Sequence, residues 1–421
     1  MNNYVFFIFT LILFILLFNV YKNSLLSPPV IFTAGFLISS FMFVCNTHIW
    51  NYVLDGSTVV YMIVGMLSFI FGCIVCYKKI TIPDNIIGGK IIQIRPKYLI
   101  AVFFVIEVVG IGLRFLVLSY SLGSMSLENE ALGEYRMAHQ DTPYDLALKF
   151  IVPIISAITI YAIANLLSMK VNQKKLSLSS ILLIIGYFIF STLSSARIEI
   201  IYLFVYFIVY YVIVSLGDKR RNISRKTLST VVLVFTSFFA VFFLLGYLTG
   251  KSQQQTSFFD NISIYTCSSL GALCEYMKSY SFNPADMFTD SMRGIYNILS
   301  YIGINIERIS KTPPVGFVQF GNMTHTTNVY TCFHTPIHDF GYVGSCIVMF
   351  FQGVFYQKIY NTAKEKLRKN NNRWLFIYIY MCPMILISSI SERFSNSVLT
   401  ITTIVFWFAI KFINKSIRSY K

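Results

Sequence analysis

Charged residues are scarce in this sequence. They make up 12% of its 421 residues, whereas soluble domains carry about a quarter. A soluble fold of this size could not cover its surface with so few charges, which excludes a cytosolic enzyme. The same composition excludes a disordered chain, a secreted domain stapled by disulfides and a coiled coil. Acidic residues are the rarer sign, because 18 Asp and Glu stand against 34 Lys and Arg, for a net charge of +16.

Several motifs for nucleotide chemistry are also missing. The sequence contains no Walker loop, dinucleotide fingerprint, nucleophile elbow or Asp-x-Asp pair. Their absence argues against a nucleotide-driven pump and against a nucleotide-sugar transferase with a metal site. No groove of basic and aromatic residues is evident either, so the positive charge does not predict nucleic acid as a partner.

Long apolar runs are what the sequence has in abundance. Hydrophobic types make up 56% of the chain, and about eleven runs approach the roughly 20 apolar residues that a spanning helix needs. These runs lie near 3–21, 29–45, 57–77, 98–119, 148–168, 178–194, 198–216, 228–248, 339–358, 374–390 and 396–413. The pattern predicts an all-α polytopic integral membrane protein with about eleven transmembrane helices.

Charges between the runs predict how the chain is oriented. Lys and Arg collect in alternate connections, each of which carries a net charge between +1 and +4. These positive connections are residue 22 and residues 78–97, 169–177, 217–227, 361–373 and 411–421. The remaining connections carry little or no positive charge, so the positive-inside rule puts them on the outer side. The N-terminus is then expected outside and the C-terminus in the cytoplasm.

This orientation divides the chain into three predicted parts. Residues 1–248 would hold eight transmembrane helices and an outer loop at 120–147. Residues 249–338 would form a large, partly helical periplasmic loop, in which 262–278 is typical of a helix and 294–306 of a short interfacial segment. The last three helices and a cytoplasmic tail would occupy residues 339–421. Long loops are uncommon unless they act as lids or binding elements.

Histidines concentrate on the predicted outer face. All five fall there or at its rim, at positions 48, 139, 325, 334 and 338. One interpretation is that the outer face carries chemistry. The other is that His simply avoids hydrocarbon.

The stretch 325–344 is dense in hydroxyl, amide and imidazole groups. Asp339 follows His338 directly, and it could orient a neighbouring His, act as a base or cap a helix. His334 and His338 are four residues apart, a spacing that could bind a metal on a helix. Pro336 lies between them and no acidic residue completes a zinc-protease pattern, so no metal is expected.

Two sets of ionisable residues lie in or beside the predicted helices. Arg197 occupies a tight outer turn near Glu199. Its guanidinium suits a phosphate at headgroup depth, but it could also reach lipid headgroups or pair with Glu199. Glu107 and Arg114 are seven residues apart in one span, so they share a face about 10 Å apart along the axis. Such a pair either faces a cavity or forms a polar network between helices.

Two further arginines stand in the outer loops. Arg136 is the one base in the acidic loop 120–147, where a surface ion pair is the simpler interpretation. Arg293 precedes the apolar segment 294–306, where it could contact lipid headgroups or a substrate phosphate. Gly341 and Gly344 are expected to allow close helix packing.

The order of these features resembles the O-antigen polymerases of the Wzy type, which join oligosaccharide repeat units. The resemblance covers the whole architecture of many spans with one dominant outer loop in the second half. Two local features carry it, namely Arg197 after Ser194-Ser195-Ala196 and the hydroxyl-rich run that ends in Asp-Phe-Gly-x-x-Gly at Gly344. The resemblance implies a helical bundle of the GT-C type. It also implies that Arg136 and Arg293 match arginines that the family uses in its outer loops.

A reaction at the outer face of the bacterial inner membrane follows from this resemblance. The donor would be a glycan on undecaprenyl pyrophosphate, and the acceptor a single repeat unit on the same lipid. Lipid pyrophosphate would leave, and a separate chain-length regulator would be a partner. Because the donor is already activated, no ATP and no cofactor are expected.

Site residues are expected from that reaction. Fixed cations would stabilise the leaving pyrophosphate, and a base would take the proton of the acceptor hydroxyl. The expected catalytic residues are Arg197, His325, His338 and Asp339. The expected substrate contacts are Arg114, Arg136, Arg293, Glu199, Tyr330 and His334.

Two alternatives share the membrane and the lipid-linked substrate. An O-antigen ligase differs in its acceptor, and its pattern of a loop His before spaced Gly residues fits His334, Gly341 and Gly344 poorly. A lipid-linked oligosaccharide flippase is expected to have more equal halves, short loops and a charged central cavity, which the long outer segment 249–338 does not fit.

Overall fold

Helices follow the apolar runs of the sequence. The computed structural model describes residues 1–21, 24–80, 91–94, 97–122, 144–171, 174–194, 197–216, 258–304, 316–323, 326–369 and 371–420. All predicted spans except 228–248 coincide there with helices or helical turns, and 228–248 lies outside the described residues. The predicted all-α class is confirmed in this general form, with one short β-ribbon as the exception.

Five described helices are long and apolar enough to cross a membrane. Their apolar segments are Asn2–Val20, Pro28–Trp50, Gly56–Val75, Tyr98–Tyr120 and Leu146–Lys170. Shorter apolar helices cover Leu178–Leu193, Ile198–Ile213 and Arg373–Ser389. These helices support a membrane protein, whereas the full set of eleven spans and the orientation of the termini stay predictions.

The chain divides into two compact units. Unit 1 comprises residues 1–79, 256–361 and 384–401, and unit 2 comprises residues 80–255, 362–383 and 402–421. Each unit therefore combines segments that are far apart in the sequence. The three predicted parts of the chain describe membrane topology, and they stay a prediction.

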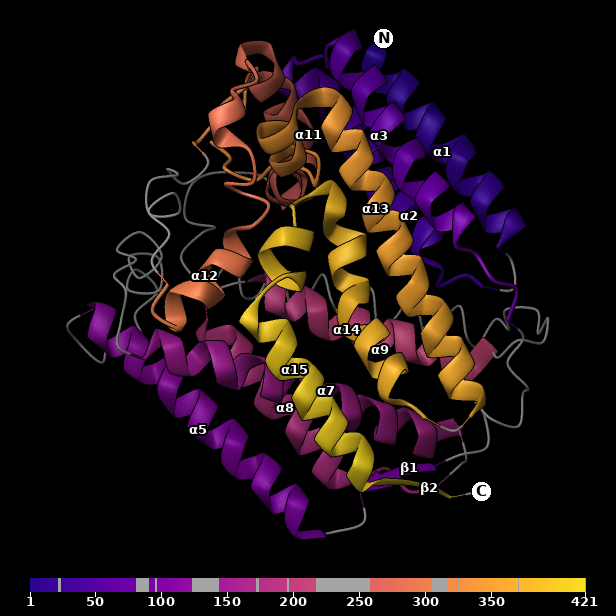
Figure 1. The fold of residues 1–421 in the computed structure, drawn as a ribbon, viewed down its shortest axis with the longest axis vertical. Helices are drawn as coiled ribbons and strands as arrows, with labels where there is room; N and C mark the ends of the chain where they lie inside the picture. Colours follow the sequence, from indigo (N-terminus) through magenta and orange to yellow (C-terminus); the bar gives the residue numbers. More distant parts are fainter. Residues whose placement is uncertain are drawn as a thin grey trace. The chain divides into compact units, whose positions relative to one another are not determined.

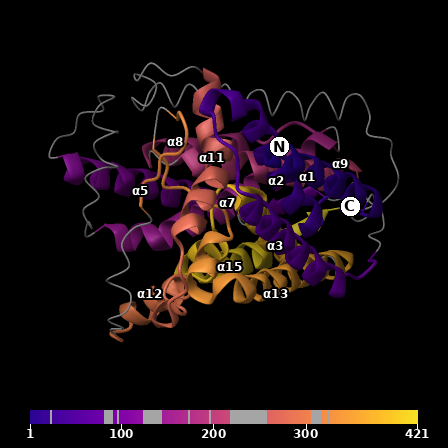
Figure 2. The same ribbon diagram turned by 90° about the horizontal axis from the view of Figure 1, so that it is seen from above.

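Unit 1 contains the first three helices and the helices of the second half. Its elements are α1 (Asn2–Val20), α2 (Pro28–Trp50), α3 (Gly56–Val75), α11 (Phe258–Ser279), η1 (Pro284–Asp286), α12 (Arg293–Tyr301), η3 (Ile387–Ser389), η4 (Phe394–Val398) and most of α13 (His334–Arg368). The helices α1, α2 and α3 lie side by side (Figures 1 and 2). The helix predicted near 262–278 is confirmed as α11. The predicted interfacial segment 294–306 contains most of the short helix α12, and its place in the interface stays a prediction.

A pair of glycines brings α3 and α13 into backbone contact. A Cβ added at Gly72 would lie 2.1 Å from the Phe350 carbonyl oxygen, and one at Gly353 would lie 2.0 Å from the Phe69 oxygen. In a membrane, no hydrophobic force drives helices together, so their association depends on close packing. Small residues such as glycine allow that close approach. Gly72 and Gly353 therefore allow α3 and α13 to pack closely.

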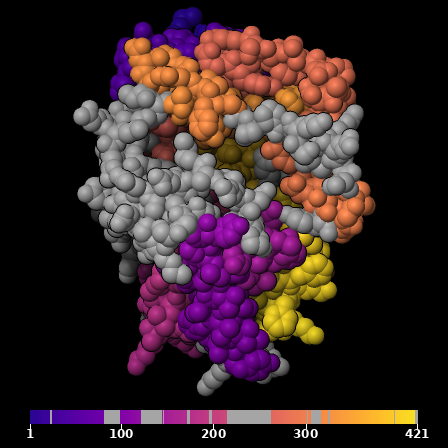
Figure 3. All heavy atoms as spheres, turned by 90° about the vertical axis from the view of Figure 1, so that its left-hand side faces the viewer, coloured from indigo at the N-terminus to yellow at the C-terminus, as the bar shows by residue number. Residues whose placement is uncertain are grey.

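Unit 2 is built on a second set of helices. Its elements are β1 (Ile91–Ile94), α5 (Lys97–Leu122), α7 (Asp145–Val171), α8 (Leu178–Leu193), α9 (Arg197–Leu216), most of α14 (Arg373–Leu386), α15 (Ile401–Ser416) and β2 (Ile417–Tyr420). The outward side of α5 is exposed (Figure 3) and carries apolar residues such as Val105 and Val108. This composition is the one that a lipid-facing helix surface requires.

One two-stranded ribbon departs from the all-α prediction. The strands β1 and β2 pair antiparallel, with Ile91 opposite Tyr420 and Ile94 opposite Ile417. Three of the four residues of β1 are isoleucine, a β-branched type that favours extended backbone. The sequence pattern missed the ribbon because neither strand is long enough to show an alternating period.

Candidate functional site

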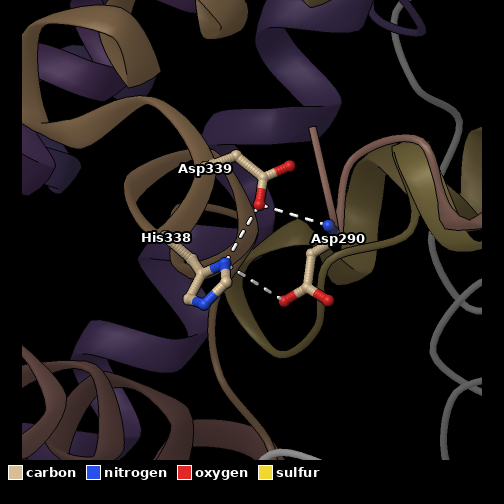
Figure 4. A group of neighbouring side chains, drawn as sticks. All are labelled: Asp290, His338 and Asp339. Atoms are coloured by element: carbon tan, nitrogen blue, oxygen red, sulfur yellow. Dashed lines mark hydrogen bonds and ion pairs between the residues drawn. The ribbon is translucent and has the colours of Figure 1, made fainter. Parts of the chain in front are cut away.

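The clearest cluster of chemical groups lies in unit 1, where α13 begins. His338 and Asp339 are neighbours on this helix, and the His338 Nδ1 lies 3.0 Å from the Asp339 Oδ1. A carboxylate can only accept hydrogen bonds, so Nδ1 carries the proton of this contact. The other ring nitrogen of His338 points away from both neighbouring carboxylates (Figure 4). In a neutral imidazole, that Nε2 atom is the proton acceptor.

Asp339 is held by groups from another part of unit 1. Its side chain is 0% exposed. Its Oδ2 accepts the Ser291 backbone N–H at 2.7 Å, and its Oδ1 accepts the Asp290 N–H at 3.2 Å and the Thr289 hydroxyl at 3.3 Å. These bonds tie α13 to the segment that enters α12. Among the roles expected for Asp339, orienting a neighbouring His fits its contact with His338. Its other bonds hold residues 289–291 and do not cap the start of α13.

A break in α13 follows the pair at once. Gly341 has φ 65° and ψ −172°, so two helical pieces meet there. This backbone region is essentially restricted to glycine. Gly341 therefore ends the turn that holds His338 and Asp339, which differs from the helix-packing role expected for it. A Cβ at Gly344 would lie 2.6 Å from the Phe340 Cβ on the same helix.

Asp290 links the pair to an arginine. One nitrogen of the Arg293 guanidinium lies 2.5 Å from the Asp290 Oδ1. The other Asp290 oxygen, Oδ2, lies 3.6 Å from the His338 Nδ1. The Arg293 side chain remains 33% exposed and that of His338 24% exposed. Both can therefore be reached by a ligand.

The surroundings stabilise the charged form of His338. The hydrogen bond to Asp339 raises the pKa of His338 above its usual range, and the nearby charges of Asp290, Asp339 and Asp286 raise it further. Burial acts in the opposite direction but is the smaller effect. A raised pKa makes His338 a stronger base when it is deprotonated.

His334 lies one turn earlier and is in a different state. Its ring packs at a tilt against Tyr276, at 4.4 Å, and against Tyr330, at 4.5 Å between ring centroids. Burial first, and then the charge of His338, lower the pKa of His334 to about 4, so its imidazole is neutral at physiological pH. His334 and Tyr330 are both buried. Their position suits packing against the turn that carries His338 better than direct contact with sugars.

Ligand atoms of Asp290, His338 and Asp339 lie within 4.8 Å of one another, close enough for a metal ion. The atoms are already engaged, however. Arg293 holds one oxygen of Asp290, and backbone N–H groups hold both oxygens of Asp339. A cation would have to displace these partners and the Nδ1 proton. We therefore interpret the group as a hydrogen-bonded network.

A second cluster lies in unit 2. The Arg114 guanidinium pairs with the Glu199 Oε1 at 2.8 Å and lies 4.8 Å from the centre of the Phe190 ring. The Tyr187 hydroxyl donates to the Glu199 backbone carbonyl at 3.3 Å. The partner of Arg114 is thus on α9, although Glu107 shares its helix. This arrangement joins α5, α8 and α9 through charge and aromatic contact.

Glu107 is separate from that ion pair. Its side chain is buried, and its Oε1 has no hydrogen-bond partner among the described residues. A Cβ at Gly186 would lie 2.2 Å from the Glu107 Oε2, so the glycine makes room for the carboxyl group. The sequence predicted that Glu107 and Arg114 either face a cavity or form a polar network between helices. For Glu107, both arrangements stay predictions.

Three of the expected site residues cannot be placed in this way. Arg197 begins α9, but its side chain lies outside what the structure describes. Arg136 and His325 fall outside the described residues altogether. Their roles stay predictions.

Asp290 and Tyr276 are the residues that sequence reasoning missed. Asp290 stands three residues before Arg293, a spacing at which side chains meet on a helical turn, and this spacing could have indicated the ion pair. Tyr276 carried no such signal, because its contact with His334 joins α11 to α13.

Comparison of the chain with known proteins finds no match. The chain matches no protein-family model, no curated protein and no solved structure.

Proposed function

We propose that this chain is a membrane glycosyltransferase that polymerises undecaprenyl-pyrophosphate-linked repeat units at the outer face of the bacterial inner membrane. One observation carries the proposal, namely the His338–Asp339 pair with its free ring nitrogen turned away from the carboxylates. A hydroxyl acceptor needs a base held in this manner. The resemblance of the run ending at Gly344 to the O-antigen polymerases supplies the substrate class.

His338 is the proposed base. Its Nε2 accepts the proton of the acceptor hydroxyl as the hydroxyl oxygen forms a bond to the anomeric carbon of the donor. The bond from that carbon to the pyrophosphate oxygen breaks, and lipid pyrophosphate leaves with the electron pair. Asp339 orients the ring and stabilises its charged form. No metal and no cofactor takes part in this proposal.

Arg293 is the proposed contact for the leaving pyrophosphate. A guanidinium forms strong, charge-assisted hydrogen bonds to phosphate oxygens, and fixed positive charge stabilises the negative charge that develops as the bond breaks. Its partial exposure and its place in the same unit as His338 support this role. Arg197, Arg136 and His325 remain proposed site residues on the resemblance alone. Arg114 and Glu199 are already paired with each other, which makes them weaker candidates.

Five apolar helices support the proposed membrane location. The bacterial inner membrane, the outward N-terminus, the cytoplasmic C-terminus and the chain-length regulator as partner all belong to the proposal.

A surface-glycan gel tests this function. A bacterial strain that lacks the protein is re-supplied with wild type, His338→Gln, Arg293→Gln or Arg197→Ala, and each variant is quantified in the membrane. We expect wild type to restore the ladder of polymer lengths. The variants should leave a single repeat unit on the lipid core, because loss of a base slows transfer by about 10²–10⁴-fold. His48→Gln is the matched control, since His48 lies in the last turn of α2 and is exposed, and it should restore the ladder fully.

Two other results would contradict parts of the proposal. If the deleted strain attaches no repeat unit at all to its lipid core, polymerisation is not the missing step, and a ligase or flippase becomes the better explanation. If His338→Gln restores a full ladder, His338 is not the base.

A further inference from the structure

The contacts of Asp290 suggest how the site responds to its substrate. Its two carboxylate oxygens face two different groups. The Oδ1 is 2.5 Å from the Arg293 guanidinium, and the Oδ2 is 3.6 Å from the His338 Nδ1. Asp290 thus contacts both the proposed phosphate contact and the proposed base. Its side chain is 12% exposed, so solvent screens its charge only in part.

We propose that Asp290 is a positioning residue that couples diphosphate binding at Arg293 to proton acceptance by His338. This inference rests on the proposed function of the site. While Arg293 pairs with Asp290, the positive guanidinium offsets much of the carboxylate charge that His338 experiences. A diphosphate that engages Arg293 competes for the guanidinium and weakens that ion pair. The freed charge of Asp290 then stabilises the protonated form of His338.

The coupling would follow the catalytic cycle. Donor binding strengthens His338 as a base before the acceptor hydroxyl gives up its proton. After transfer, the lipid diphosphate departs and Arg293 pairs again with Asp290. His338 then holds its proton less strongly and releases it to water. The proton taken from the acceptor is thereby discharged, and the base is ready for the next repeat unit.

Other ionisable groups also surround His338, and their influence on its protonation must be distinguished from that of Asp290. On α13 itself these are Asp339 and His334. Asp286 lies on η1 and contributes negative charge to His338. Tyr276 lies on α11, and Tyr280 directly follows that helix. Asp286 offers a matched acidic control, because its charge also acts on His338 whereas the ion pair in the proposed coupling is that of Asp290 with Arg293.

Carbethoxylation of His338 measures its protonation directly, because the reagent attacks the neutral ring. The full-length protein in lipid nanodiscs is treated with diethyl pyrocarbonate across pH 5.5 to 8.5, with and without inorganic pyrophosphate as the probe. Tandem mass spectrometry separates residue 338 from residue 334. The midpoint of the pH profile is the readout, because simple shielding by pyrophosphate lowers the rate without moving the midpoint.

We expect pyrophosphate to raise the midpoint of wild type by roughly 1 pH unit. Asp290→Asn should start from a lower midpoint and show no rise. Asp286→Asn should also start lower but keep the rise, since the proposed coupling runs through the ion pair of Asp290 with Arg293. Arg293→Gln is a second variant, and it should not respond to pyrophosphate.

Three results would overturn the coupling: no rise in wild type, an equal rise in Asp290→Asn, or an undiminished rise in Arg293→Gln. An equal rise in Asp290→Asn would mean that pyrophosphate acts on His338 directly. The readout contains no glycan, so it is independent of the ladder test. A rise that depends on Asp290 in a chain that does not restore the ladder would uphold the coupling and reject the polymerase.

Discussion

His338, the proposed base, is held by a single buried carboxylate, that of Asp339. Asp339 accepts hydrogen bonds from two backbone N–H groups, a hydroxyl and the imidazole. The backbone donors satisfy its charge in a buried position, where an unpaired carboxylate would be very costly. The imidazole is therefore held by an anchored partner, and its second nitrogen is left for chemistry.

Arg114 and Glu199 depend on each other in a similar way, and this dependence can be measured. Arg114→Met should destabilise the purified protein by about 3 kcal/mol, because it leaves Glu199 as an uncompensated charge in an apolar setting. The double variant Arg114→Met with Glu199→Leu should recover most of that loss. Thermal unfolding in lipid nanodiscs provides the comparison.

Lys174→Met is the control for that series, since Lys174 is exposed in unit 2 and its removal should change little. The pairing would be rejected if the double variant were as unstable as the two single variants added together. Such additivity would mean that the 2.8 Å contact contributes no coupling.

Helix α13 is interrupted at Gly341, just after the pair His338 and Asp339. The break at Gly341 separates the turn with His338 and Asp339 from the long helix that contacts α3 through Gly353. A continuous helix would carry the chain in another direction after residue 340. The kink has an identifiable cause, a glycine in a backbone region that other residues rarely adopt.

Replacing that glycine tests the interpretation. Gly341→Ala should lower stability by about 1–3 kcal/mol, because alanine is strained at this φ and ψ. Steric conflict is not the cause, since the nearest atom to an added Cβ is in Phe282 at 3.5 Å. Melting temperatures of the variant and wild type give the measurement.

Gly112→Ala is the matched control within a helix. Nothing lies within 4 Å of a Cβ added at Gly112, so alanine should be neutral or stabilise the helix by up to about 1 kcal/mol. Equal melting temperatures for Gly341→Ala and wild type would show that the backbone at Gly341 is not constrained.

The whole molecule is expected to insert with its positive connections in the cytoplasm. A fluorescent protein fused to the C-terminus should therefore fluoresce, since it folds in the cytoplasm. Alkaline phosphatase fused after Ser281 should be active, since it matures only outside. The reverse pattern in both fusions would invert the proposed orientation and move His338 to the cytoplasmic side.

The control for this topology experiment is a phosphatase fusion at Lys174, which lies in a predicted cytoplasmic connection. It should be inactive although it is made in similar amounts. Activity at both Ser281 and Lys174 would mean that the fusions disturb insertion, and epitope accessibility in intact cells would then replace them.

The apolar runs determined the membrane class and the position of most helices by themselves, because helix formation and hydrophobicity are properties of neighbouring residues. Local composition also identified residues 325–344 as chemically unusual. Their partners were decided only by the tertiary structure. Asp290 and Asp339 are 49 residues apart, and Arg114 and Glu199 are 85 apart, and no local pattern specifies which distant side chains meet.

The tertiary structure likewise determines the backbone conformation of Gly341 and the pairing of β1 with β2. Glycine permits many conformations, so the sequence Asp-Phe-Gly shows that a break is allowed but not that it occurs. The strands β1 and β2 come from opposite ends of unit 2, and each is extended because its partner supplies the hydrogen bonds. Local chemistry therefore selected the candidate residues, while long-range packing decided which of them can act together.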